Sequence, residues 1–171
     1  MAQQRIGVIG YGEVGKIFAK GLKGRPGVAS TGAWDVRFAA AATQAAERAH
    51  AAQAGVTTHD SMRALCAASE LVISAVTASN TLAVAQEAAQ HIRPGTIFLD
   101  LNSASPGTKQ QCAALIDARE AHYVEAGVMT SVPPYGIKVP LLLGGAKAVE
   151  LAGVLSDWGM DARAISDKVG V

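Results

Sequence analysis

The stretch "VIGYGEVG", residues 8–15, carries three glycines, Gly10, Gly12 and Gly15, in a G-x-G-x-x-G pattern. It follows a short apolar run typical of a strand and opens a helical pattern, which is the context that gives such a motif meaning. In that context Gly10 permits a tight turn, Gly12 lets a pyrophosphate approach the backbone, and Gly15 lets helix and strand pack closely. The alternative is a glycine-rich turn without a ligand, but the position favours a dinucleotide site.

The residues between the glycines belong to the same expected site. A helix that starts here directs backbone N–H groups and a partial positive charge toward phosphates. We therefore expect Tyr11, Glu13 and Val14 to bind the cofactor together with the glycines. The Glu13 side chain is more typical of support for the first helical turn than of chemistry.

Two charged residues, Asp35 and Arg37, follow the second expected strand and bear on the choice of cofactor. Asp35 lies about 20 residues after the glycine turn, where an acidic residue accepts hydrogen bonds from the adenosine ribose. Its carboxylate would repel the 2′-phosphate of NADP, which favours NAD. The Arg37 guanidinium could pair with that phosphate, so NADP stays open, as does an ordinary solvated ion pair.

Apolar runs and helical stretches alternate through the chain, which predicts an α/β fold with a doubly wound, mostly parallel sheet. A loop over residues 130–140 interrupts the rhythm because prolines and a glycine break regular structure there. We see no linker and expect one domain over residues 1–171. We predict strands near residues 5–9, 28–34, 55–58, 70–76, 96–101, 122–126, 141–145 and 162–165, and helices near 13–23, 42–53, 61–68, 80–91, 106–121 and 146–157.

Composition limits the classes of partner. The formal charge is only +1, which gives no strong electrostatic reason to bind nucleic acid or an anionic membrane. No apolar run approaches the ~18 residues of a membrane span, and no secretory signal is visible. The two cysteines, Cys66 and Cys112, fit buried inert thiols, without metal spacing. We therefore expect a cytoplasmic protein without a metal.

A second motif, "DLNSASPGT" at residues 100–108, ends an apolar strand with short polar side chains. Ser105 before Pro106 is a good helix cap, but a cap needs only one such side chain. Together with the glycine turn and "SAVTASN" at 74–80, this stretch resembles the β-hydroxyacid dehydrogenases, a group that includes 6-phosphogluconate dehydrogenase and 3-hydroxyisobutyrate dehydrogenase. The specific element is D-x-[SN]-[ST]-x-x-P.

The resemblance covers essentially the whole chain as the family's N-terminal NAD(P)-binding Rossmann domain. It implies that Asn102 and Ser103 contact the carboxylate and hydroxyl groups of a hydroxy-acid substrate. It also implies that the backbone of Val76 and Thr77 lines the nicotinamide ribose, although strand core and a strand-end turn would explain these two residues equally well. The implied reaction is hydride transfer between a hydroxy acid and nicotinamide.

Two departures from the family pattern matter. Where the family usually has Ser-Gly-Gly, this chain has Met129, Thr130 and Ser131, so Thr130 is only a weak candidate substrate ligand. The family's catalytic lysine lies on a helix that follows this domain, and we expect it beyond Val171. We read Lys168 as a solvated charge and Lys109 as a surface residue rather than a base.

The resemblance therefore implies no catalytic residue within these 171 residues and a homo-oligomer only with a C-terminal helical domain. A non-catalytic Rossmann module that binds or senses a nucleotide is the alternative class. A methyltransferase is disfavoured because Gly15 completes a dinucleotide pattern.

Overall fold

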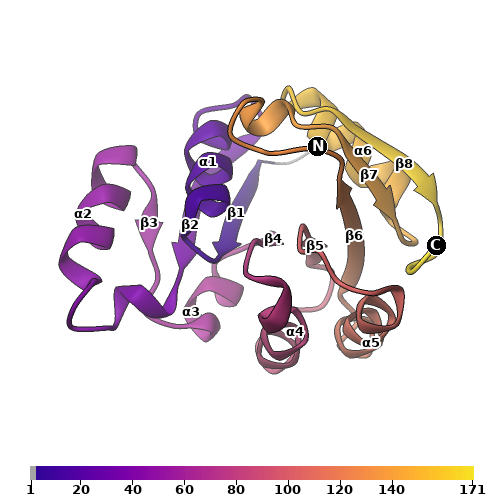
Figure 1. Ribbon diagram of the computed structural model, residues 1–171, viewed down its shortest axis with the longest axis horizontal. Coiled ribbons are helices and arrows are strands. Elements are labelled where there is room, and N and C mark those ends of the chain that lie inside the picture. The colour runs from indigo at the N-terminus through magenta and orange to yellow at the C-terminus, as the bar shows by residue number, and fades with distance from the viewer. Residues whose placement is uncertain (1–2) are drawn as a thin grey trace.

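One sheet organises the protein. The computed structural model describes residues 3–171, and these form an eight-stranded sheet with the strand order β3-β2-β1-β4-β5-β6-β7-β8 (Figure 1). Neighbouring strands are parallel except for the antiparallel pair β6–β7. The predicted mostly parallel, doubly wound sheet is confirmed. The strands are β1 (Gln4–Ile9), β2 (Val28–Trp34), β3 (Thr57–Thr58), β4 (Leu71–Ser74), β5 (Ile97–Asp100), β6 (His122–Val128), β7 (Leu141–Gly144) and β8 (Ala162–Ser166).

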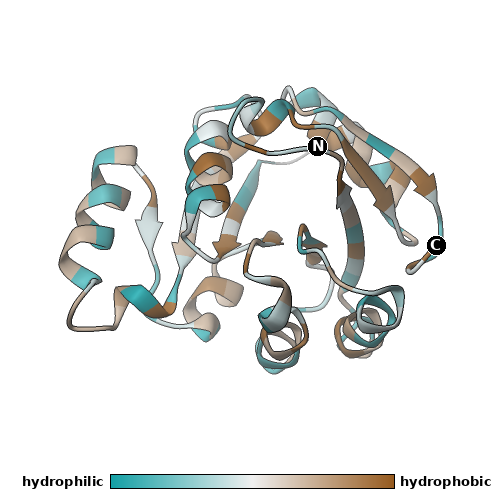
Figure 2. Cartoon of the chain, viewed as in Figure 1, coloured by the Kyte–Doolittle hydropathy of each residue, from teal (hydrophilic) through white to brown (hydrophobic). Residues whose placement is uncertain are grey.

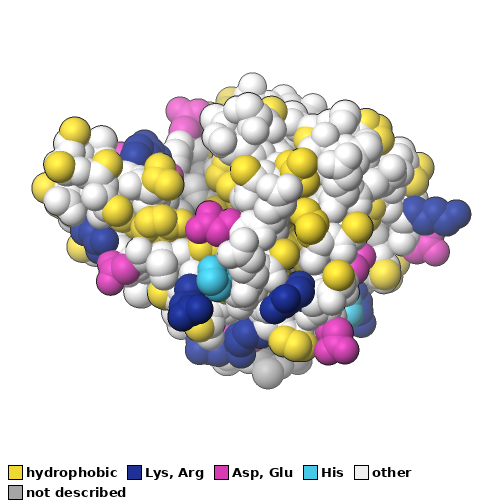
Figure 3. Space-filling model, turned by 90° about the horizontal axis from the view of Figure 1, so that it is seen from below, with side chains coloured by type: hydrophobic (Ala, Val, Ile, Leu, Met, Phe, Trp, Pro, Cys, Tyr) yellow, Lys and Arg dark blue, Asp and Glu magenta, His cyan; other side chains and the backbone are white. Residues whose placement is uncertain are grey.

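Helices cover both faces of the sheet, with α1 and α6 on one side and α3, α4 and α5 on the other (Figure 1). The helices alternate between hydrophobic and hydrophilic positions, as expected when one side packs on a sheet (Figure 2). On the face seen from below, basic and acidic side chains are interspersed (Figure 3), in keeping with the small net charge. The helices are α1 (Glu13–Leu22), α2 (Gln44–Ala54), α3 (Met62–Ala67), α4 (Thr81–Ala89), α5 (Pro106–Asp117) and α6 (Ala148–Asp157), with short 3₁₀ turns η1 (Val36–Phe38), η2 (Ala78–Asn80) and η3 (Gly136–Lys138).

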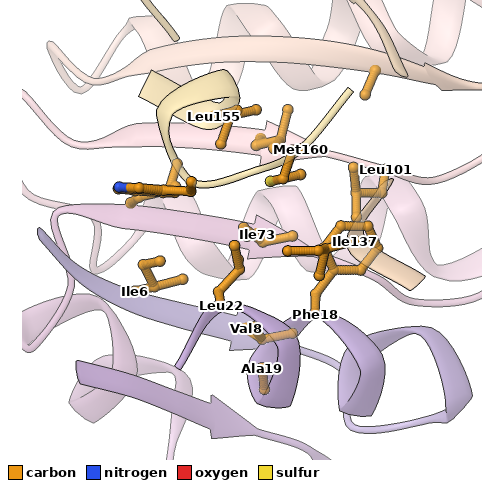
Figure 4. Packing of buried hydrophobic residues seen from close by; sticks show 14 of the residues in the cluster. Ile6, Val8, Phe18, Ala19, Leu22, Ile73, Leu101, Ile137, Leu155 and Met160 are labelled. Atoms are coloured by element: carbon orange, nitrogen blue, oxygen red, sulfur yellow. The ribbon is translucent and has the colours of Figure 1, made fainter. Parts of the chain in front are cut away.

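Aliphatic side chains and a few aromatic rings fill the core on the α1 side of the sheet. Phe18 and Leu22 of α1 point at Val8 and Ile73 of the central strands, and Ile137 of η3 closes the same cluster (Figure 4). These side chains are nearly or fully excluded from solvent. Burial of this kind contributes about 1.5–3 kcal/mol for each large apolar side chain, so α1 holds its position by packing rather than by caps.

The strand order brings the two sequence motifs to one edge of the sheet. The chain winds outward from β1 to β3 and then returns to place β4 on the other side of β1. Parallel strands present their carboxyl ends at the same edge, and a crevice forms where the winding direction reverses. The segments that follow β1, β4 and β5, namely residues 10–15, 75–80 and 101–105, therefore lie next to one another.

Candidate functional site

The three glycines of the turn have different structural reasons to be glycine. Gly10 has a φ of 96°, and a Cβ there would collide with the Ala75 carbonyl oxygen. A Cβ on Gly15 would collide with the Gly10 carbonyl oxygen, so this residue allows α1 to approach β1. Gly12 has a φ of −82° and only one neighbour for a Cβ, the Arg37 Nη2 atom at 3.8 Å. The fold needs glycine at the first and third positions but not at Gly12.

Helix α1 begins at this turn without a side-chain cap, since its N-cap residue is Gly12. Its first backbone N–H groups are thus directed at the edge of the sheet, where a phosphate would be stabilised. Glu13 is exposed in the first turn, as expected, whereas Val14 packs against the core. The expected cradle for a pyrophosphate is formed by backbone, not by the side chains of these residues.

Tyr11 contributes its backbone but not its side chain to this edge. The Tyr11 ring is buried beside Phe38, with ring centroids 5.4 Å apart, and its hydroxyl forms a 2.8 Å hydrogen bond with His50 Nδ1. The Tyr11 amide donates to Asp35 Oδ2 at 2.6 Å. That bond fixes the turn to the end of β2.

Asp35 lies directly after β2, as predicted, but its carboxylate is already bound by Arg37. The Arg37 amide donates to Asp35 Oδ1 at 2.9 Å, and the Arg37 Nε and Nη2 atoms lie 3.2 Å from the two carboxylate oxygens. Burial alone would raise the pKa of Asp35, but the hydrogen bonds from Arg37 and from the Tyr11 amide outweigh it, so the pKa lies below its ordinary value. The carboxylate is therefore ionised and already accepts four hydrogen bonds.

Arg37 also contacts the glycine turn and a second acidic residue. Its Nη2 atom donates to the Tyr11 carbonyl oxygen at 2.6 Å, and its Nη1 atom lies 3.4 Å from Glu47 Oε1. Lys16 pairs with the same glutamate, Nζ to Oε2, at 3.0 Å. Acidic and basic side chains therefore alternate from the end of β2 to helices α1 and α2. They lie beside the open space next to Gly12, where a Cβ would have only the Arg37 Nη2 atom as a neighbour.

Asn102, predicted to be a substrate ligand, is buried and its side chain connects two strand ends. Its Oδ1 atom accepts a 2.8 Å hydrogen bond from the Val76 amide, and its Nδ2 atom donates to Ser74 Oγ at 3.0 Å. Its own amide donates to Asp100 Oδ1 at 2.8 Å. The Asn102 side chain therefore has a structural role, because it holds the Val76 backbone in position.

The other predicted polar residues lie at the same edge and are exposed: Thr77, Ser103 and Thr130. The Thr77 hydroxyl accepts a 2.7 Å hydrogen bond from Asn80 Nδ2. Ser105 caps α5 by accepting from the Thr108 amide at 3.2 Å, so the capping interpretation holds for that serine. Direct substrate contact by Ser103 or Thr130 stays a prediction.

The prediction that Lys109 is a surface residue is wrong. Its side chain is only 8% exposed, its ammonium donates to the Ala126 carbonyl oxygen at 3.2 Å, and Glu125 Oε2 lies 3.9 Å away. The sequence contained a signal for this, because the buried positions of α5 recur at helical spacing and include this lysine: Lys109, Cys112, Ala113 and Ile116.

Two further polar groups lie close to Lys109 beneath the second motif. Asp100 is buried at the end of β5, and the Tyr123 hydroxyl donates to its Oδ2 atom at 2.5 Å. Burial raises the pKa of Asp100, although the hydrogen bonds from Tyr123 and Asn102 act in the opposite direction. The motif's aspartate therefore supports the loop from below rather than facing a ligand.

Within residues 3–171, no group of three or more His, Cys, Asp or Glu side chains is placed to hold a metal ion. No helix of the same residues is long and apolar enough to cross a membrane.

The model of a family described as the NAD binding domain of 6-phosphogluconate dehydrogenase matches residues 5–149. A curated protein of Methanothermus fervidus, an uncharacterized 28.5 kDa protein, is 27% identical over 97% of this chain and 60% of its own length.

Two solved structures are also similar. A conserved hypothetical protein from Sinorhizobium meliloti has a TM-score of 0.93 and 39% identity, over 99% of this chain and 56% of its own. A conserved protein of unknown function, described as structurally similar to 3-hydroxyacid dehydrogenases, has a TM-score of 0.79 and 28% identity, over 97% of this chain and 59% of its own. The chain thus spans a little over half the length of the proteins it matches.

More distant structures share the fold alone. A 3-hydroxyisobutyrate dehydrogenase from Mycobacterium tuberculosis has a TM-score of 0.79 at 18% identity and covers 98% of this chain and 56% of its own. An imine reductase from Aspergillus terreus in complex with NADPH4 has a TM-score of 0.74 at 23% identity, with 99% and 57% covered. The family model that matches residues 5–149 confirms the predicted family, and the similar solved structures confirm the predicted fold.

Proposed function

The chain belongs to the family of the NAD binding domain of 6-phosphogluconate dehydrogenase, and from that premise we propose that it binds NAD or NADP as the nucleotide-binding part of an oxidoreductase. The cofactor supplies hydride transfer at its nicotinamide ring. This chain's residues contribute the pyrophosphate cradle over residues 10–15 and the backbone of Val76 and Thr77 beside the nicotinamide ribose.

The observation that carries the proposal is the room above Gly12. The protein's own packing explains glycine at Gly10 and Gly15, but Gly12 has an ordinary φ and open space around a Cβ. A ligand that approaches the backbone supplies a reason for glycine there. The uncapped start of α1 beside it provides N–H donors for the phosphates.

The test is the fluorescence of NADH and NADPH on addition of the protein. We expect saturable binding of at least one nucleotide and its loss in Gly12→Val, whose Cβ has room in the fold but whose side chain would block the close approach of a pyrophosphate. Gly153→Val is the matched control, because a Cβ at that glycine of α6 meets nothing within 4 Å. If neither nucleotide binds wild-type protein, or if Gly12→Val binds normally, the proposal fails.

For the choice of nucleotide, we propose a preference for NAD that depends on Asp35. Its ionised carboxylate opposes a 2′-phosphate and holds the Arg37 guanidinium, which otherwise would be available to that phosphate. Asp35→Ser is expected to raise the affinity for NADPH relative to NADH. An unchanged ratio of the two dissociation constants would show that Asp35 does not lie at the ribose site.

For the reaction, we propose oxidation of a small hydroxy acid, with Ser103 and Thr130 on the substrate side. This proposal rests on the resemblance to β-hydroxyacid dehydrogenases and places the general base outside these 171 residues. The absence of a general base typically costs ~10²–10⁴-fold in rate, so residues 1–171 alone are expected to show negligible turnover with NAD and a panel of hydroxy acids. Rapid turnover would refute the missing base, and nucleotide binding without turnover in any longer form would favour the sensing module.

A further inference from the structure

A cavity of about 270 Å³ lies between the start of α5 and the strands β6, β7 and β8. Two sides of it come from the segments that the family resemblance associates with substrate. The motif loop supplies Ala104 and Pro106, and the end of β6 supplies Gly127 and Met129. Apart from backbone and apolar groups, the lining contains two charged side chains, Lys109 and Glu125.

Lys109 is an expensive residue to bury, and its hydrogen bonds are incomplete. An ammonium has three N–H donors, and the structure records one hydrogen bond for it among residues 3–171, to the Ala126 carbonyl oxygen at 3.2 Å. Glu125 Oε2, at 3.9 Å, is close enough to compensate charge but too distant for a hydrogen bond. Donor capacity therefore remains on the wall of the cavity.

Glu125 has matching acceptor capacity. Its Oε1 atom accepts a 2.6 Å hydrogen bond from the Gly170 amide, whereas its Oε2 atom has only the long contact with Lys109. The side chain as a whole is only 15% exposed. A ligand that donates a hydrogen bond to Glu125 Oε2 and accepts one from the Lys109 ammonium would supply the hydrogen bonds that both groups lack.

The surroundings make the wall nearly neutral. Asp100 and Tyr123, the other titratable groups near Lys109 on β5 and β6, are hydrogen bonded to each other. Cys112, one turn further along α5, is a buried thiol whose pKa is raised to about 11 by burial. A simple anion would gain from Lys109 but would be repelled by Glu125, whereas a molecule with both an anionic oxygen and a hydroxyl satisfies both.

We propose that this cavity is a subsite for a hydroxy acid, in which Lys109 binds the carboxylate and Glu125 accepts the hydrogen of the hydroxyl group. The inference rests on the proposed function, since it names the substrate class of the same site, but it assigns two residues that the motifs did not. The volume of the cavity is several times the ~30 Å³ that one water molecule takes up, so a small acid fits into it. Ser103 does not line this cavity and is not required for either contact.

The test compares 3-hydroxypropionate with propionate by amide chemical shifts of ¹⁵N-labelled protein, residues 1–171. We expect saturable shifts at Ala104 and Gly127 with 3-hydroxypropionate, and binding weaker by about tenfold with propionate, the low end of what a hydrogen bond to a charged group contributes. Lys109→Met is expected to abolish the binding. Lys168→Met, at an exposed lysine that lines a different cavity, is the matched control and leaves it unchanged.

Glu125→Met keeps Lys109, removes the acceptor for the hydroxyl hydrogen, and decides the case if Lys109→Met does not fold. It is expected to erase the preference, so that propionate binds as well as 3-hydroxypropionate. Absence of saturable shifts, an unaffected Lys109→Met, or a retained preference in Glu125→Met would overturn the subsite. NADH fluorescence on the same samples separates the two proposals. Binding of NADH without binding of 3-hydroxypropionate refutes the subsite alone, whereas wild-type protein that does not bind the nucleotide refutes the proposed function.

Discussion

Replacement of Asn102 by alanine distinguishes a structural side chain from a substrate ligand. The change deletes the hydrogen bonds to the Val76 amide and to Ser74 Oγ, at 2.8 and 3.0 Å. Ser74 is buried and Val76 is half-buried, so water does not replace the lost partner freely. We expect Asn102→Ala to lower the free energy of unfolding even when no ligand is present.

The size of the effect follows from the two lost bonds. We expect the loss at the half-buried Val76 amide to cost about 1 kcal/mol, and the buried Ser74 hydroxyl, left without its partner, to cost about 1–3 kcal/mol. Together these predict a loss of about 2–4 kcal/mol. For a chain of this length each kcal/mol corresponds to about 2–4 °C in Tm, so the midpoint should fall by roughly 4–16 °C.

Urea denaturation followed by circular dichroism measures the loss, with thermal unfolding as a second assay. The matched control is Ser103→Ala, the adjacent residue of the same motif, which is exposed and should stay within about 0.5 kcal/mol of wild type. Loss of less than about 0.5 kcal/mol in Asn102→Ala would refute the structural role. A direct ligand would show the opposite pattern, with normal stability and weakened substrate binding.

Three further outcomes are expected. Gly15→Ala should destabilise the protein by at least about 1–3 kcal/mol, because the new Cβ collides with the Gly10 carbonyl oxygen, and urea titration will show whether it does. Asp35→Asn should be less stable than wild type at neutral pH, and the difference in stability should disappear as pH falls through the lowered pKa of Asp35. The reason is that a carboxyl group with a depressed pKa stabilises the fold only where it is ionised. Equal unfolding curves at pH 7 would contradict this. Cys66 and Cys112, with pKa values raised by burial to about 12 and about 11, should not react with an aromatic disulfide reagent at about pH 8 until the protein is unfolded, and prompt reaction of either native thiol would contradict their burial.

The fold could be predicted from the sequence because local signals agreed with one another. The glycine turn, the apolar strands and the helical stretches all required parallel strands with helices between them. Element ends were less accurate: the helix predicted over 106–121 stops at Asp117, and the strand predicted over 70–76 covers only Leu71–Ser74. Short polar residues at an element's end satisfy backbone groups in ways that periodicity does not record.

The site was predictable by residue type but not by contact. A motif indicates that an asparagine stands at position 102, yet the direction of its side-chain amide depends on Ser74, at the end of β4, and on Val76, just after it. The pairing of Arg37 with Glu47 joins a strand end to a separate helix and has no local pattern. Lys109 differs, since helical spacing alone places it on the buried side of α5.

The two borders of the sheet are unequal, and this restricts how copies of the protein can associate. Among residues 3–171, one border is β3, two residues long, and the other is β8, with five residues and the exposed side chain of Ile165. A border strand presents unpaired N–H and C=O groups that another chain can extend, and a two-residue strand offers too few of them. Pairing of copies through their sheets would therefore join β8 to β8 about a twofold axis. Such a contact would use up the longer border strand of both molecules, so it would produce a pair rather than a fibre.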